Sequence, residues 1–106
     1  MPQDYAQAMQ WYRKAADQGN ALAQNNIGAL YENGQGATRD YAQAMQWFRK
    51  AAAQGLAGAQ FNIGWLYEKG LGAQPDKGQA IGWYRKAAAG GDNDARQALS
   101  RLGQGG

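Results

Sequence analysis

The stretch "DYAQAMQWFRKAA", from Asp40 to Ala52, decides the fold because near-copies of it occur three times in a chain of 106 residues. "DYAQAMQWYRKAA" begins at Asp4 and "DKGQAIGWYRKAA" begins at Asp76, so the copies start 36 residues apart. Residues 4–39 and 40–75 are identical at 26 of 36 positions. A fixed period of this length is typical of solenoids, in which each unit buries its apolar face by stacking on its neighbours. The close identity favours either a recent duplication or a consensus-designed array.

Each unit is predicted to contain two helices. The first begins at Asp4, Asp40 or Asp76, and a glutamine follows three residues later, as in a capping box. The second covers residues 21–33 and, one unit later, residues 57–69. Helices of both kinds are expected to end where a left-handed glycine closes the last turn. These glycines are Gly19, Gly34, Gly55, Gly70 and Gly91.

Apolar residues at steps of three and four predict one buried face on each helix. On the first helices this face comprises Ala8, Trp11, Tyr12, Ala15 and Ala16, then Ala44, Trp47, Phe48, Ala51 and Ala52, with Trp83 in the third copy. On the second helices it comprises Ala23, Ile27, Leu30 and Tyr31, then Ala59, Ile63, Leu66 and Tyr67. Gly28 and Gly64 lie inside the second helices, where glycine costs about 1 kcal/mol relative to alanine. We expect these two glycines to let the second helix lie close against paired alanines of the first.

The pattern A-x-A-Q-x-N-I-G-x-L-Y-E-x-G-x-G-A, followed by D-x-x-x-A-x-x-W-[YF]-R-K-A-A-x-x-G, resembles the Sel-one-like repeat (SLR), a relative of the tetratricopeptide repeat. The resemblance implies an all-α fold, a right-handed αα-superhelix (solenoid) of about six antiparallel helices. It also implies protein–protein interaction or scaffolding rather than catalysis. We expect one SLR domain over residues 1–106, divided into a half repeat (4–18), two repeats (21–54 and 57–89) and a C-terminal capping helix (93–103).

One face of the second helix differs between the copies, while the rest of that helix is unchanged. Leu22, Asn25, Ala29 and Asn33 are replaced by Gly58, Phe61, Trp65 and Lys69, at steps of three, four and four residues. The last helix would add Asp94, Gln97 and Arg101 to this face. The resemblance implies that the face lines a concave groove, as in tetratricopeptide domains.

The predicted partner-binding face joins this stripe to polar residues beside it. It comprises Asn25, Asn26, Ala29, Glu32, Asn33, Phe61, Asn62, Trp65, Glu68 and Lys69. Phe61 and Trp65 are i,i+4 neighbours and form one aromatic ledge, which favours a binding anchor. The alternative is that both rings pack on the last helix. Asn26 and Asn62 are expected either to bind a peptide backbone or to form local hydrogen bonds.

Composition excludes several other functions. The net charge of +3 comes from 11 basic and 8 acidic residues that are interspersed, so we expect no nucleic-acid binding. Cysteine and histidine are absent, which excludes thiolate and histidine catalysis and any ordinary zinc site. We expect no cofactor and no metal. Glu32 and Glu68 are the candidate carboxylate pair for acid–base chemistry, and they alone do not predict an enzyme.

No apolar run approaches the roughly 20 residues of a membrane span, so we expect no membrane insertion. The N-terminal "MPQDYAQAMQ" lacks the pattern of an export signal, which predicts a cytoplasmic protein, whereas the resemblance points to the bacterial envelope. The leading hypothesis is a module that holds a protein or peptide partner in the groove. The alternative is a structural array that forms homo-oligomers through its unpaired terminal helices.

Overall fold

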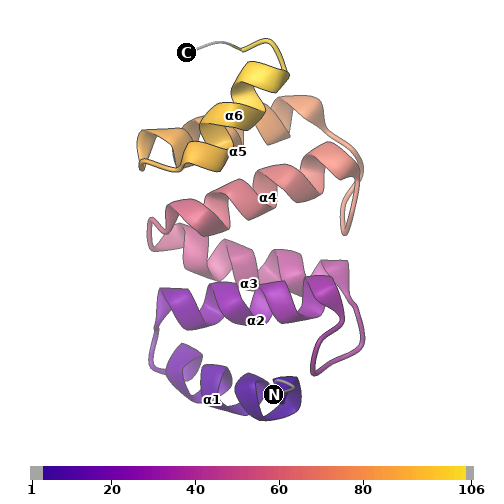
Figure 1. Cartoon of the computed structure of the whole chain (residues 1–106), viewed down its shortest axis with the longest axis vertical. Coiled ribbons are helices and arrows are strands. Elements are labelled where there is room, and N and C mark those ends of the chain that lie inside the picture. Colours follow the sequence, from indigo (N-terminus) through magenta and orange to yellow (C-terminus); the bar gives the residue numbers. More distant parts are fainter. Residues whose placement is uncertain (1–3, 105–106) are drawn as a thin grey trace.

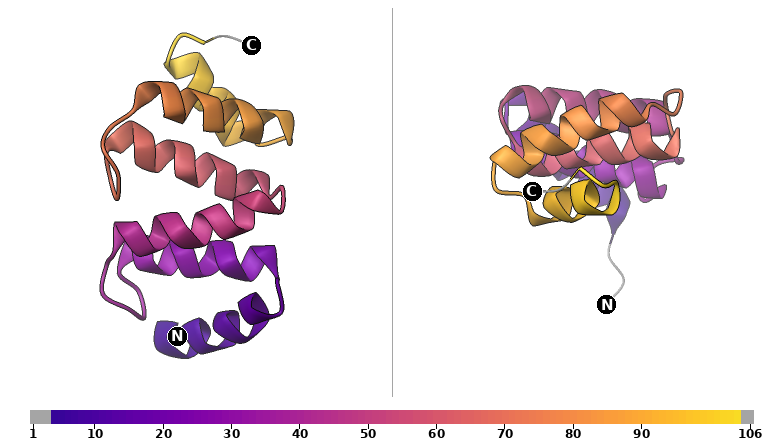
Figure 2. Two further views of the ribbon diagram at one scale, coloured as in Figure 1. Left: turned by 180° about the vertical axis from the view of Figure 1, so that it is seen from behind. Right: turned by 90° about the horizontal axis from the view of Figure 1, so that it is seen from above.

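The computed structural model describes residues 4–104 and contains six α-helices and no strand over this range. The helices are α1 (Tyr5–Asp17), α2 (Ala21–Asn33), α3 (Tyr41–Ala53), α4 (Ala57–Lys69), α5 (Lys77–Ala89) and α6 (Asn93–Arg101). They stack in chain order along a body of 41 × 26 × 23 Å (Figure 1). The two ends of the chain therefore lie at opposite ends of the stack (Figure 2). This arrangement is an αα-solenoid, as the repeat predicts.

The predicted caps define the helix boundaries. The carboxylates of Asp4, Asp40 and Asp76 each accept the backbone N–H of the glutamine three residues later, at 2.9–3.0 Å. The backbone N–H of Asp40 donates to the Tyr31 carbonyl at 3.0 Å, so this N–H is already satisfied without the Gln43 side chain. At the other end of α3, Gly55 has a φ of 88°, a left-handed conformation that glycine adopts without strain.

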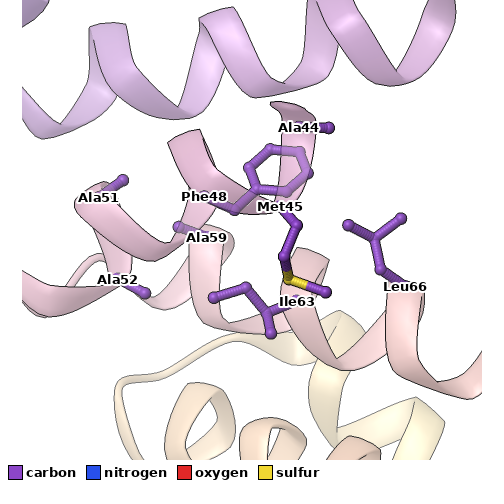
Figure 3. Packing of buried hydrophobic residues seen from close by; sticks show 8 residues of the cluster. All are labelled: Ala44, Met45, Phe48, Ala51, Ala52, Ala59, Ile63 and Leu66. Atoms are coloured by element: carbon purple, nitrogen blue, oxygen red, sulfur yellow. The ribbon is translucent and has the colours of Figure 1, made fainter. Parts of the chain in front are cut away.

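The core forms between successive helices. In the central cluster, Phe48 of α3 and Ile63 and Leu66 of α4 have no exposed surface. Met45 of α3 lies in the same cluster, beside these residues (Figure 3). Two further clusters join α1 to α2 and α5 to α6. Each helical pair thus has its own core, and neighbouring pairs pack on one another, as in other repeat proteins.

The tryptophans of α1, α3 and α5 are not core residues of their own pair, which corrects the sequence prediction. Trp11 is 63% exposed, and Trp47 and Trp83 are half-buried. Met9 and Met45, which the sequence analysis did not assign to the core, are buried instead. The reason is position on the helix: Trp47 packs against the α1–α2 cluster and Trp83 against the α3–α4 cluster. Each of these two side chains is covered by the preceding pair of helices.

The two glycines inside α2 and α4 allow close packing, as predicted, but against aromatic rings rather than paired alanines. A Cβ atom on Gly28 would lie 2.6 Å from Cδ1 of Phe48. A Cβ atom on Gly64 would lie 2.7 Å from Cδ1 of Tyr84 and 3.1 Å from the Ala80 carbonyl oxygen. The two distances to ring atoms are shorter than van der Waals contact, so only glycine fits at these positions without a shift of the ring.

Candidate functional site

An open cleft of about 340 Å³ lies between α4 and α6. It is lined by Phe61 and Trp65 of α4 and by Asp94, Gln97, Ala98 and Arg101 of α6. The variable face predicted from the sequence therefore comes together here from two neighbouring helices. We use the name groove for the predicted variable face of α2, α4 and α6, and the cleft lies where α4 and α6 contribute to this face.

The aromatic ledge is partly packed and partly open. Phe61 and Trp65 are both half-buried. The Phe61 ring lies 5.5 Å from the Tyr84 ring, centroid to centroid, at an interplanar angle of 32°. Trp65 packs against the α3–α4 cluster. Both side chains also line the cleft, so one side of each ring contributes to the fold while another side faces the open space.

Glu68 forms a closed network at the end of α4. Arg101 donates two hydrogen bonds to its carboxylate, from Nη1 to Oε2 at 2.6 Å and from Nη2 to Oε1 at 2.9 Å. The Tyr84 hydroxyl donates a third bond to Oε1 at 2.7 Å. The Arg101 bonds lower the pKa of Glu68 to about 2, although burial of the carboxyl opposes this shift. Burial and the adjacent carboxylate raise the pKa of Tyr84.

Glu32 occupies the same repeat position on α2 but lacks this network. Its side chain is half-buried, and burial raises the pKa of its carboxyl. Within residues 4–104, no hydrogen bond or ion pair offsets this effect. Counting back 36 residues from Tyr84 and Arg101 gives Phe48 and Trp65. The hydroxyl and the guanidinium that hold Glu68 are therefore both missing at the equivalent positions around Glu32.

The remaining predicted site residues are polar or small. Asn62 of α4 donates from Nδ2 to Oδ1 of Asn25 on α2, at 3.0 Å, so these two residues join neighbouring repeats. Asn26 and Ala29 are half-buried on α2. Asn33 and Lys69 are exposed at the last positions of α2 and α4. All ten predicted residues thus belong to α2 or α4.

Tyr84 and Ala98 were missed by sequence reasoning. Tyr84 was given no role in the sequence analysis, and it lies buried in α5 with no exposed surface. The usable signal is a pair of exchanges between repeats, Phe48 to Tyr84 and Trp65 to Arg101. Each exchange adds a donor, and the two donors meet at one carboxylate.

Glu68 accepts three hydrogen bonds from Arg101 and Tyr84, two on Oε1 and one on Oε2. In the described part of the chain, no group of three acidic, histidine or cysteine residues is placed to hold a metal ion. Among the six helices, none is long and apolar enough to cross a membrane.

The stacked helical pairs and their variable groove define a repeat protein of the αα-solenoid class. A family model described as "Sel1 repeat" matches residues 1–20, 21–56 and 57–92. The chain belongs to the Sel1 repeat family, whose members are generally protein–protein interaction modules and non-enzymatic scaffolds. No curated protein matches the sequence.

Three solved structures are similar to the whole solenoid. The first is a protective antigen of uropathogenic Escherichia coli with an SLR fold, with 44% identity and a TM-score of 0.87 over 91% of this chain and 21% of that chain. The second is a Sel1 repeat protein from Oxalobacter formigenes, with 42% identity and a TM-score of 0.84. The match covers 93% of this chain and 41% of that chain. The third is cysteine rich protein B of Helicobacter pylori, with 26% identity and a TM-score of 0.80. The match covers 86% of this chain and 68% of that chain. The chain spans less than half the length of the first two.

Proposed function

We propose that the chain is a protein–protein interaction module that binds an extended peptide or a partner helix in the groove. The observation that carries this proposal is the cleft between α4 and α6, where the open sides of Phe61 and Trp65 adjoin polar side chains of α6. Aromatic side chains in a concave site, surrounded by a polar rim, are the usual anchors of protein–protein interfaces. The Sel1 family assignment supports a protein partner.

Selection from a displayed library of random peptides tests this proposal. We expect peptides that bind the wild-type chain to lose at least tenfold in affinity for the double variant Phe61→Ala, Trp65→Ala, since each ring is an anchor. Trp11→Ala is the matched control, because Trp11 is an exposed tryptophan of α1 outside the groove. Circular dichroism checks that the variants remain helical. Peptides that bind the double variant as tightly as the wild type would contradict the proposal.

Loss of the Phe61 ring also removes packing against Tyr84, so a variant that leaves the core intact is needed. Gln97→Arg places a large charged side chain at an exposed position of the cleft wall on α6. We expect this variant to keep the wild-type stability and to lose peptide affinity because the cleft is partly filled. If the Gln97→Arg variant binds the peptides with unchanged affinity, the peptides bind outside the α4–α6 cleft.

We also propose a second candidate, self-association through the α1 end, because two large apolar side chains are open there. Trp11 is 63% exposed and Leu22 is 62% exposed, whereas Trp47 and Trp83 pack on the preceding pair of helices. A second copy that stacked on α1 and α2 would cover Trp11 in the same way. We expect light scattering to show a concentration-dependent dimer that Trp11→Ala with Leu22→Ala abolishes. A strict monomer over a wide concentration range would exclude this candidate.

A further inference from the structure

We propose that Glu32 is the specificity element of the groove and that its carboxylate binds an arginine side chain of the partner, with the guanidinium beside the Trp65 ring. The inference rests on the proposed function of the groove and adds the chemistry of one partner residue. Glu32 and Glu68 are equivalent positions of the repeat, 36 residues apart, and their surroundings differ.

The chain contains its own example of the predicted complex. Arg101 of α6 reaches the Glu68 carboxylate of α4 and forms two parallel hydrogen bonds of 2.6 and 2.9 Å. The side chain of Arg101 remains 52% exposed, while that of Glu68 is 12% exposed. A guanidinium thus approaches from the open side and pairs with a carboxylate that is held in the wall. This two-bond geometry is the strongest kind of charge-assisted contact in proteins.

One repeat earlier, a glutamate is retained at the position of Glu68, but the residues that donate hydrogen bonds to Glu68 are not retained. Glu32 is the counterpart of Glu68, but Phe48 takes the place of Tyr84 and Trp65 takes the place of Arg101. Partial burial weakens the hydration of the Glu32 carboxylate, whose oxygens still reach solvent, and no protein donor within residues 4–104 compensates for this. A cationic donor from a bound partner would supply the missing hydrogen bonds. The position therefore gains more from a ligand cation than an exposed glutamate would.

Trp65 makes arginine a better fit than lysine. Its repeat position is that of Arg101, the residue that supplies the guanidinium to Glu68. A planar guanidinium can bond a carboxylate through two N–H groups and stack on an indole at the same time. A lysine ammonium is a compact, strongly hydrated charge and does not match both surfaces. The same indole also lines the α4–α6 cleft, so one extended peptide can contact both places.

A titration with small probes tests the site without a known partner. N-acetyl-L-arginine amide is added to the wild-type chain, and the indole N–H signal of Trp65 is followed by NMR. The neutral isostere N-acetyl-L-citrulline amide and the corresponding lysine amide serve as ligand controls. We expect the arginine amide to bind most tightly and Glu32→Gln to weaken it about tenfold or more, because the charged hydrogen bonds are lost. Asp17→Asn, which removes an exposed carboxylate of α1, is the matched protein control and should change nothing.

Several results would overturn the proposal. These are equal affinity for the arginine and citrulline amides, no arginine-dependent shift at all, or no effect of Glu32→Gln. Equal binding of the lysine amide would overturn the assignment to arginine. The variant Trp65→Arg gives an independent check, since it copies the Arg101 arrangement onto Glu32. Because this variant lacks the Trp65 indole, isothermal titration calorimetry measures its affinity for the arginine amide. We expect this affinity to be at least tenfold weaker, because the variant's own guanidinium occupies the carboxylate.

The peptides selected against the groove separate this inference from the proposed function. If they require Phe61 and Trp65, carry an arginine at one fixed position and bind Glu32→Gln at least tenfold more weakly, both proposals are supported. If they require the two rings but carry no fixed arginine and ignore Glu32→Gln, the arginine inference fails and the groove function stands. If they do not require the rings, the groove function fails, and the amide titration alone decides whether Glu32 binds arginine.

Discussion

At the residue scale, one glutamate position of the repeat exists in two electrostatic states. Glu68 accepts three hydrogen bonds from Arg101 and Tyr84, whereas Glu32 has none in the described part of the chain. The backbone around the two residues is the same repeat, so the difference comes from the exchanged side chains alone. Two of the exchanged side chains, Tyr84 and Arg101, supply all three hydrogen bonds to the Glu68 carboxylate.

The ion pair between Glu68 and Arg101 makes part of the stability of the fold depend on pH. Its pKa is lowered from 4.5 in the unfolded reference to about 2, mainly by the Arg101 hydrogen bonds. Because the folded-state pKa is the lower one, this carboxylate stabilises the fold above pH 4.5, and the contribution is lost as the pH falls from 4.5 to about 2. We expect urea unfolding to show a weaker loss of stability over this range for Arg101→Gln. Equal acid sensitivity in the variant and the wild type would contradict the role of the pair.

The sign is opposite at Glu32, where burial raises the pKa of the carboxyl. The folded state then holds the proton more tightly than the unfolded state, so stability rises as the pH falls through the raised pKa toward 4.5. We expect Glu32→Gln to be more stable than the wild type at pH 7 and this advantage to shrink toward pH 4.5. Urea unfolding at several pH values measures it, with Asp17→Asn as the control. A loss of stability at pH 7 would show that Glu32 already has a favourable partner.

At the scale of the elements, α4 and α5 pack so closely that a single atom decides the fit. Gly64 has no room for a Cβ atom, which would lie 2.7 Å from the Tyr84 ring. Gly82, in the middle of α5, has no neighbouring atom within 4 Å of such a Cβ. Both glycines weaken their helix by about the same amount, roughly 1 kcal/mol relative to alanine. Packing against the neighbouring helix is therefore what distinguishes them.

Alanine at these two positions should have opposite effects. We expect Gly64→Ala to lower the free energy of unfolding by about 1–2 kcal/mol, since overpacking outweighs the gain in helix propensity. We expect Gly82→Ala to raise it by about 0.5–1 kcal/mol, because only the propensity changes. Urea unfolding followed by circular dichroism measures both. A Gly64→Ala variant as stable as Gly82→Ala would mean that Tyr84 moves aside without cost.

The helices themselves were predictable from the sequence, and the direction of individual side chains was less so. The bounds of α2 and α4 agree with residues 21–33 and 57–69, because caps and glycines are local signals. The tryptophans were assigned to the wrong surroundings. A step of three or four residues identifies a helical face but not which neighbour covers it. Periodicity alone therefore could not show that Met45 is more buried than Trp47.

The candidate site was also only partly predictable from the sequence. The variable face of α4 was visible because four changes fall at helical spacing, and two of the residues concerned, Phe61 and Trp65, do line the cleft. The Glu68 network was not visible, since it joins residues 16 and 33 positions apart on three helices. Only the stacking of the helices brings those side chains together.

At the scale of the whole molecule, the first two pairs of helices each cover a tryptophan of the following pair. Trp47 packs on the α1–α2 cluster and Trp83 on the α3–α4 cluster, while Trp11 has no preceding pair within residues 4–104. The stability of such an array is a sum of units and of the interfaces between neighbours. The three tryptophans share one repeat position, and Trp47 and Trp83 therefore report on two interfaces, whereas Trp11 reports on an exposed face of α1.

Their alanine variants should separate these interfaces. We expect Trp47→Ala and Trp83→Ala each to lower the free energy of unfolding by about 2 kcal/mol, because both side chains pack on a neighbouring core. We expect Trp11→Ala to cost less than about 1 kcal/mol, since the ring is 63% exposed and its cation–π contact with Lys14, at 5.3 Å from the ring centroid, is a surface contact. Urea unfolding at a low, fixed protein concentration measures all three. A cost for Trp11→Ala that equals the others and grows with protein concentration would show that a second molecule covers Trp11, as self-association requires.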